Sequence, residues 1–151
     1  MTGKVIIYLN AADFNQSCWF MNGAHHVGDL ASLTSAVVDK EVIVVVPARD
    51  VLLISAQLPK MNRSRLLQAL PFALEEQLID DVEDLHFAAG VEQANGELSV
   101  AIVAKAKMQE WLTWLQQYHI RPSSMISAVF AIPIEPGAWS IALLSDGAIV
   151  R

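Results

Sequence analysis

Two pairs of neighbouring acids, Glu75-Glu76 and Asp80-Asp81, are the residues of this chain that most resemble part of a catalytic or metal-binding set. A general acid–base site or a two-metal site needs carboxylates that converge on one pocket from separate elements. Adjacent residues on a helix lie about 100° apart and therefore diverge. We expect neither catalysis nor metal binding from these pairs.

The histidines and the single cysteine do not form a reactive set either. His25 and His26 are adjacent on an expected strand, where successive side chains point to opposite faces, so they are poorly placed to share a metal ion. His86 lies on another expected strand and is predicted to be a hydrogen-bonded core or boundary residue. Cys18 is expected to be a small core residue rather than a nucleophile. The sequence also lacks a G-x-S-x-G elbow. We therefore predict no catalytic residue, no bound metal and no cofactor.

The composition predicts a cytoplasmic globular protein. Hydrophobic residues make up 54% of the chain, and its mean hydropathy is +0.38. The longest apolar runs, such as VIVVVPA at 42–48, are nevertheless far shorter than the ~18 residues that span a bilayer. Asn10 and Asp13 end the first apolar stretch before a signal peptide could form. A lone cysteine agrees with a reducing compartment.

Negative charge is concentrated in one part of the chain. Residues 66–104 contain eight acids and no Lys or Arg, so this segment carries −8 while the rest of the chain carries +2, for a net charge of −6. Such a field repels phosphate backbones and argues against nucleic-acid binding. Two interpretations remain: a solvated helix face, or a docking patch for a basic protein surface. Six of the acids fall within ten residues of one another: Glu75, Glu76, Asp80, Asp81, Glu83 and Asp84.

The first third of the chain predicts an α/β layer. Residues 4–10, 16–22 and 24–30 are expected to be neighbouring antiparallel strands. Asp29 or Ser32 is expected to cap a short helix over LASLTSAVV, residues 30–38. The run VIVVVP at 42–47 is typical of a parallel strand that is buried on both faces.

The next segment predicts a strand and then a helix. Residues 50–59 form the expected strand, and Asn62 or Ser64 is expected to cap the helix. Its apolar residues repeat every four positions, at Leu66, Leu70, Leu74 and Leu78. Pro71 predicts a kink, or a second helix that opens at Pro71 and holds Glu75 and Glu76 in its early turns.

The remainder predicts a hairpin, a helix and further strands. Asn95-Gly96 predicts a tight primed turn within a hairpin over residues 85–105. An amphipathic helix that ends near His119 is predicted from Met108, Trp111, Leu112, Leu115 and Tyr118. SSMISAVFAIP, residues 123–133, is expected to be a buried strand. Residues 139–151 are expected to form two strands joined by a turn at Ser145-Asp146-Gly147.

The order of three segments resembles a known family. VVPARDVLLISAQLP is followed by RLLQALPFALEEQLIDDVEDLHFA and then, after the hairpin, by MQEWLTWLQQ. This order is similar to that in the cytoplasmic part of the L protein of the bacterial type II secretion system, from about Val42 to Arg151. The most specific piece is ALPFALEEQLIDDVEDLHFA.

The resemblance implies an actin-like, ribonuclease-H-like architecture. Residues 1–47 and 106–132 would form the ribonuclease-H-like core, residues 48–105 an inserted β-α-β-β subdomain, and residues 133–151 the start of a second, truncated lobe. The chain would then be an excerpt of a longer single-pass protein at the cytoplasmic face of the inner membrane, attached by a helix that this chain lacks. Around Phe130, Ile132, Trp139 and Ile141, apolar surface meant for the missing lobe is expected to be exposed or covered in an oligomer contact.

The resemblance also implies a function without catalysis. The cytoplasmic part of this family recruits the secretion ATPase by binding the N-terminal domain of that enzyme, and other inner-membrane components complete the platform; a homodimer is also compatible with it. This favours the docking interpretation of the six acids, which we take as candidate partner-binding residues.

The competing prediction is an actin-like nucleotide-binding ATPase. Such enzymes carry an Asp and a glycine-rich turn after the first strand, because backbone N–H groups must closely approach the phosphates. This chain has LNAADFNQ there, with Asn10 in place of the Asp and no glycine. The second corresponding turn, LLSDGA, has one glycine. Asp13 and Asp29 alone also supply too few acids for a ribonuclease-H-type nuclease.

Overall fold

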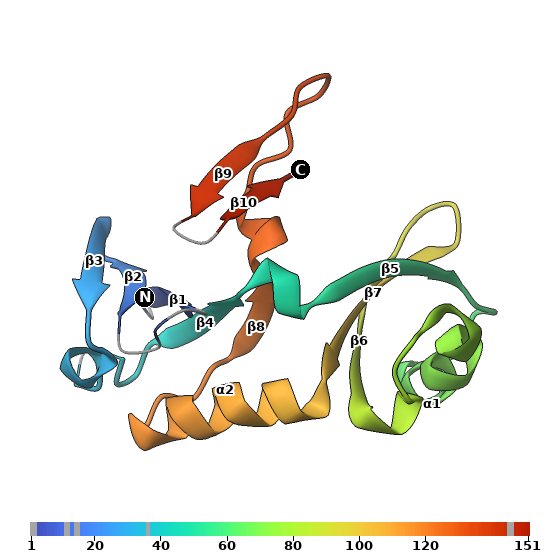
Figure 1. Cartoon of the computed structure of the whole chain (residues 1–151), viewed down its shortest axis with the longest axis horizontal. Helices are drawn as coiled ribbons and strands as arrows, with labels where there is room; N and C mark the ends of the chain where they lie inside the picture. The colour runs from blue at the N-terminus through green and yellow to red at the C-terminus, as the bar shows by residue number, and fades with distance from the viewer. Residues whose placement is uncertain (1–2, 11–12, 14–15, 36, 145–146) are drawn as a thin grey trace. The chain divides into compact units, whose positions relative to one another are not determined.

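A computed structural model describes all residues except 1–2, 11–12, 14–15, 36 and 145–146 (Figure 1). The chain divides into two compact units, Met1–Arg49 with Thr113–Arg151, and Asp50–Leu112. We call these the sheet unit and the insert unit.

The sheet unit contains a five-stranded mixed sheet in the order β3-β2-β1-β4-β8 (Figure 1). Its strands are β1 (Lys4–Tyr8), β2 (Ser17–Met21), β3 (Ala24–Gly28), β4 (Glu41–Val46) and β8 (Ser124–Ser127). The pairs β1–β2 and β2–β3 are antiparallel, whereas β4 runs parallel to both β1 and β8. Val42, Val44, Val45 and Val46 are buried, as expected for a parallel strand covered on both faces. The predicted strands in residues 4–47 are therefore confirmed.

The helix predicted over residues 30–38 is only a short 3₁₀ turn, η1 (Leu30–Leu33). Asp29 is its cap, because a carboxylate oxygen accepts a hydrogen bond from the Ala31 N–H at 2.9 Å. Ser32 instead donates its hydroxyl to the Asp29 carbonyl. Ser and Thr side chains that bond the nearby backbone disfavour a longer helix, and Thr34 also donates to the distant carbonyl of Tyr118.

The strand predicted over residues 123–133 is confirmed only at its start. After β8 the chain forms a 3₁₀ turn, η5 (Ala128–Ala131). A strand would place Phe130 and Ile132 on the same face, but the 3₁₀ turn breaks this period of two. Phe130 is exposed and Ile132 is buried, so the predicted exposure of Ile132 is wrong. Trp139 and Ile141 are exposed, as expected.

The last residues form a two-stranded antiparallel sheet of β9 (Ile141–Leu144) and β10 (Gly147–Val150). The predicted turn at Ser145-Asp146-Gly147 falls largely outside the described residues. Arg151 and Ser140 exchange two backbone hydrogen bonds that extend this ladder. The Arg151 guanidinium donates to the carbonyls of Val129 and Ile132 at 3.1 and 2.9 Å, which ties the strand to η5.

The insert unit contains a three-stranded antiparallel sheet in the order β5-β7-β6, with one α-helix packed against it. The elements are η2 (Ala48–Asp50), which begins just before this unit, β5 (Leu52–Gln57), α1 (Arg63–Leu74), η3 (Glu75–Gln77), η4 (Val82–Asp84), β6 (Leu85–Glu92) and β7 (Glu97–Ala104). The predicted β-α-β-β order is therefore present.

The β6–β7 hairpin is confirmed, but its predicted primed turn is wrong. The Gly96 N–H donates to the Gln93 carbonyl, and the Gln93 N–H donates to the Glu97 carbonyl, so three residues form the loop. Within this loop only Gly96 has a positive φ, of 80°. Asn95 instead accepts the Glu97 N–H with its side chain at 3.0 Å. A three-residue loop with glycine in the left-handed region is the alternative to the two-residue primed turn.

The helix α2 (Lys105–Gln117) extends across the division between residues 112 and 113. Trp111 and Leu115 are buried, as predicted, while Leu112 is 39% exposed. The helix ends as predicted near His119, whose φ of 55° allows the Ile120 N–H to donate to the Leu115 carbonyl at 3.0 Å.

Candidate docking surface

The apolar stripe of α1 fixes which side of this helix faces the sheet. Asn62 caps α1 by accepting the Arg65 N–H at 2.9 Å. Leu70 and Leu74 are buried in the core of the insert unit, while Leu66 and Leu78 pack against that core from its edge. The other buried members of this core all come from the sheet: Ala56, Leu85, Ala89, Leu98, Val100 and Ile102. The repeat of leucines in the sequence is therefore the face of α1 that packs on the sheet.

The helix α1 does not end at Pro71. No second helix opens at this proline; α1 continues to Leu74 although Pro71 cannot donate to the carbonyl one turn earlier. Glu75 and Glu76 therefore lie in the 3₁₀ turn η3 and not in the early turns of a second α-helix. A further 3₁₀ turn, η4, is capped by Asp81, which accepts the Glu83 N–H at 2.9 Å.

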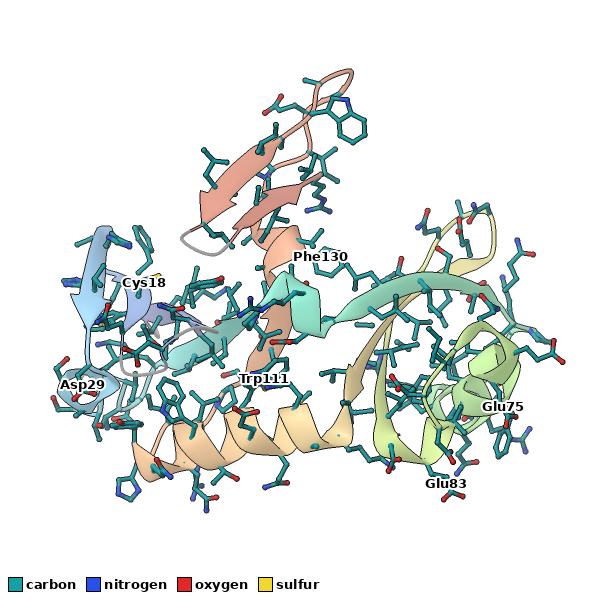
Figure 2. The ribbon with its side chains drawn as sticks, in the orientation of Figure 1. Cys18, Asp29, Glu75, Glu83, Trp111 and Phe130 are labelled. Atoms are coloured by element: carbon teal, nitrogen blue, oxygen red, sulfur yellow. The ribbon has the colours of Figure 1, made fainter. Side chains whose placement is uncertain are left out.

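These turns display the six acids to solvent. Every one of the six is exposed. In the part of the chain that the structure describes, no Lys, Arg or His forms a salt bridge with any of them. Figure 2 labels Glu75 beside the end of α1 and Glu83 just before β6. We call this set the acidic surface: Glu75, Glu76, Asp80, Asp81, Glu83 and Asp84.

The backbone around the acidic surface is held in place from both ends. Leu78 packs on the core, and Leu85 is buried at the start of β6. The Lys105 ammonium donates a hydrogen bond to the backbone carbonyl of Glu83 and not to a carboxylate. The negative charge is therefore presented by an ordered segment, and it is not neutralised within the insert unit.

Two apolar side chains on this segment were not singled out by the sequence analysis. Phe72 is 76% exposed and Ile79 is 103% exposed. The position of each residue around the helix, measured from the leucine stripe, could have identified them. Phe72 lies two residues beyond Leu70, about 200° around the helix, and Ile79 directly follows the last leucine of the stripe. Both positions are off the buried face.

The acidic surface does not have the geometry of a catalytic or metal site. Its carboxylates stand on successive short turns and exposed positions. Among the described residues, no group of three His, Cys, Asp or Glu side chains is placed to hold a metal ion. What the arrangement offers is a negative potential on an exposed face, which attracts a positively charged partner surface.

The structure places His25, His26, His86 and Cys18 at separate positions on their strands. His26 stacks on Trp19 with a ring-centroid distance of 5.7 Å, and His25 is exposed on the same strand. His86 is exposed, so the prediction of a core or boundary residue is wrong: its strand alternates, and the position falls on the outer face of β6. Cys18 is half-buried, and this burial raises the pKa of its thiol.

A cavity of about 340 Å³ lies in the sheet unit. It is lined by the end of β1 at Tyr8, by Pro47, Ala48 and Arg49 after β4, and by Leu144 and residues 147–150 of the β9–β10 hairpin. An actin-like ATPase would carry its phosphate-binding turns at two of these three places, after β1 and between β9 and β10. The described part of the second turn contributes one glycine, Gly147, and the first turn has Asn10.

The fold and the family follow from comparisons with known proteins. The cytoplasmic domain of EpsL, an inner-membrane component of the type II secretion system of Vibrio cholerae, has a similar structure, with a TM-score of 0.79 and 22% identity over 99% of this chain and 67% of that one. A PilM–PilN type IV pilus biogenesis complex is similar at a TM-score of 0.58 and 15% identity, over 98% of this chain and 60% of that one. The predicted α/β fold class is confirmed, because this chain shares its architecture with the EpsL cytoplasmic domain.

The family model for type II secretion system protein L matches residues 20–151. The type II secretion system protein L of Dickeya chrysanthemi is 36% identical over 116 residues, which cover 75% of this chain and 29% of the relative. Its counterpart in Klebsiella pneumoniae is 38% identical over 97 residues, which cover 64% and 24%. The chain belongs to the type II secretion system protein L family. It spans less than a third of the length of these curated relatives.

Proposed function

We propose that this chain is a non-enzymatic docking domain of the type II secretion platform at the cytoplasmic face of the bacterial inner membrane. Its role is to recruit the secretion ATPase by binding the N-terminal domain of that enzyme. The family membership supports a role in the secretion machinery. None of the helices among the described residues is long and apolar enough to cross a membrane.

The observation that carries the proposal is the acidic surface. Six exposed carboxylates crowd onto one segment, and none of them forms a salt bridge with a Lys, Arg or His of the described chain; the Lys105 ammonium reaches only the backbone carbonyl of Glu83. Crowded like charges on one segment repel one another. A basic partner surface would turn this repulsion into attraction and would speed the encounter of the two proteins.

The division of the chain into two compact units supports a different role for each unit. We propose that residues 1–47 and 106–132 form the ribonuclease-H-like core, that residues 133–151 begin a second lobe, and that residues 48–105 are the inserted subdomain that carries the docking surface. The insert unit has its own core of sheet and helix residues. Other inner-membrane platform components would contact the chain elsewhere.

The proposal is tested by mixing the chain with the purified N-terminal domain of the cognate secretion ATPase and measuring binding by titration calorimetry. The catalytic domain of the same ATPase is the control partner. We expect a saturable complex with the N-terminal domain alone, which weakens as salt rises above the ~0.15 M at which the Debye length is about 8 Å. Absence of a complex at low salt would overturn the proposal.

A further inference from the structure

Phe72 and Ile79 are the two large apolar side chains that the insert unit exposes beside the acidic surface. Their exposed fractions are 76% and 103%. Single exposed apolar residues are ordinary on a protein surface. Here two of them stand seven residues apart and flank Glu75 and Glu76, the first two acids of the surface.

The fold of the insert unit does not need either side chain. Its core contains Leu70 and Leu74 from α1, and Leu78 packs on that core. Phe72 points to the opposite side of the helix from this stripe. Ile79 follows Leu78 in extended chain beyond η3 and is fully exposed. Burial of both side chains against another protein would remove apolar area from water without disturbing this core.

The charges around the two side chains specify the sign of the partner. Glu75 and Glu76 follow Phe72 by three and four residues and lie in the 3₁₀ turn η3, directly after α1. Asp80 and Asp81 directly follow Ile79. A surface that covers Phe72 and Ile79 therefore approaches these carboxylates, and Lys or Arg at its rim would pair with them whereas acidic rim residues would repel them.

The shape of the two side chains specifies the form of the partner. Both protrude from the unit, as their exposed fractions show. A protruding aromatic side chain is buried most completely in a recess, and the surface of a folded domain can form a deeper recess than the shallow holes between the side chains of a single helix. Interface residues with the largest energetic effect are those that fill such pockets and lose all contact with water.

We propose that Phe72 and Ile79 are the anchor residues of the docking surface, and that they insert into an apolar recess, rimmed by Lys and Arg, on a folded protein domain. This inference rests on the proposed docking function. The acidic surface then determines the association rate of the partner, and the two anchors determine its dissociation rate.

The test is a measurement of dissociation rates with the full chain immobilised and the N-terminal domain of the secretion ATPase in solution. The variants are Phe72→Ala and Ile79→Ala. The matched control is Val91→Ala, because Val91 is 85% exposed in the same unit but lies on β6. We expect each anchor variant to dissociate about tenfold faster or more, with little change in its association rate, and the control to behave as wild type.

Two outcomes separate the inference from the function on which it rests. If the wild-type chain binds and both anchor variants dissociate like Val91→Ala, the anchors are refuted and the docking function stands. If the wild-type chain does not bind, both the docking function and the anchor assignment are refuted. A circular dichroism spectrum unchanged from wild type checks that each variant is folded, which is expected because the replaced side chains are exposed.

A second arm tests the form of the partner. A Lys-rich amphipathic helical peptide is titrated against wild type and Phe72→Ala at low salt. We expect equal, weak, salt-sensitive binding to both, since a lone helix meets only the acidic surface. Peptide binding at least tenfold weaker to Phe72→Ala would overturn the requirement for a folded domain.

Discussion

Replacing Leu74 with alanine removes one of the two buried leucines through which α1 packs in the core of the insert unit. Leu74 is 1% exposed and packs in the core with Leu70 and the sheet residues. A Leu→Ala change at such a site costs about 2–5 kcal/mol, because burial is lost and a cavity remains. A unit the size of residues 50–112 has a total stability of only about 3–9 kcal/mol at 0.05–0.15 kcal/mol per residue. The substitution therefore removes a large part of the stability that holds the acidic surface in place.

Amide hydrogen exchange followed by mass spectrometry measures this loss locally. We expect exchange in β6 and β7 to accelerate by about 30-fold or more, since each 1.4 kcal/mol corresponds to a factor of ten. The control is Leu67→Ala, because Leu67 lies on the same helix, is 37% exposed and falls outside the core cluster; it should change stability by about 0.5 kcal/mol. Equal acceleration in the two variants would refute the packing described here.

Three further expectations concern groups outside the docking surface. Hydrogen bonds from Ser55 and Asn95 lower the pKa of Glu97, so Ser55→Ala should raise that pKa towards its ordinary value in an NMR titration, and an unchanged pKa would contradict the assignment. Because the folded-state pKa of Glu97 is lowered, the stabilisation it provides is present above the unfolded-state pKa and is lost as pH falls through the folded-state value; Ser55→Ala should weaken this acid dependence. Burial raises the pKa of the Cys18 thiol, so iodoacetamide should alkylate it more slowly in the native than in the denatured chain at pH 8, and equal rates would exclude the raised pKa. With Asn10 and no glycine in the turn after β1, the chain should show no magnesium-dependent ATP binding by calorimetry; a micromolar affinity would instead support the actin-like ATPase.

Patterns that depend on burial predicted most of the fold. The run VIVVVP has no polar face, and only a strand covered on both sides accommodates it, which is how β4 is placed. The leucines of α1 repeat with the helical period, and the sheet buries the two central ones. In both cases one physical requirement, removal of apolar area from water, dominates the outcome.

Most of the wrong predictions of secondary structure fall where two local backbone conformations compete. Asn95-Gly96 has the residues of a primed turn, yet the Asn95 side chain bonds the Glu97 N–H and selects a three-residue loop. Pro71 removes one helical hydrogen bond, but packing of Leu70 and Leu74 on either side of it outweighs that loss. Between Phe130 and Ile132 a 3₁₀ turn replaces a strand, and no apolar pattern distinguishes the two over so few residues.

The docking surface was only half predicted for a related reason. Charge is visible in the sequence without a fold, so the six acids were identified at once. Exposure of an apolar residue such as Phe72 or Ile79 is defined only relative to the buried stripe, and an apolar residue near leucines is expected in a core until the phase of the helix is known.

The most direct test of the docking account is the association rate of the ATPase N-terminal domain with the double variant Glu76→Lys, Asp80→Lys. The two reversals change the charge of residues 66–104 from −8 to −4, since each adds two units. At low salt we expect association about tenfold slower than for wild type, with a smaller change in dissociation. Reversal of Arg63 and Arg65 to Glu, at the other end of α1, is the control and should not slow association. Wild-type association in the Glu76→Lys, Asp80→Lys chain at low salt would contradict the account and leave the acidic surface as a solvated face.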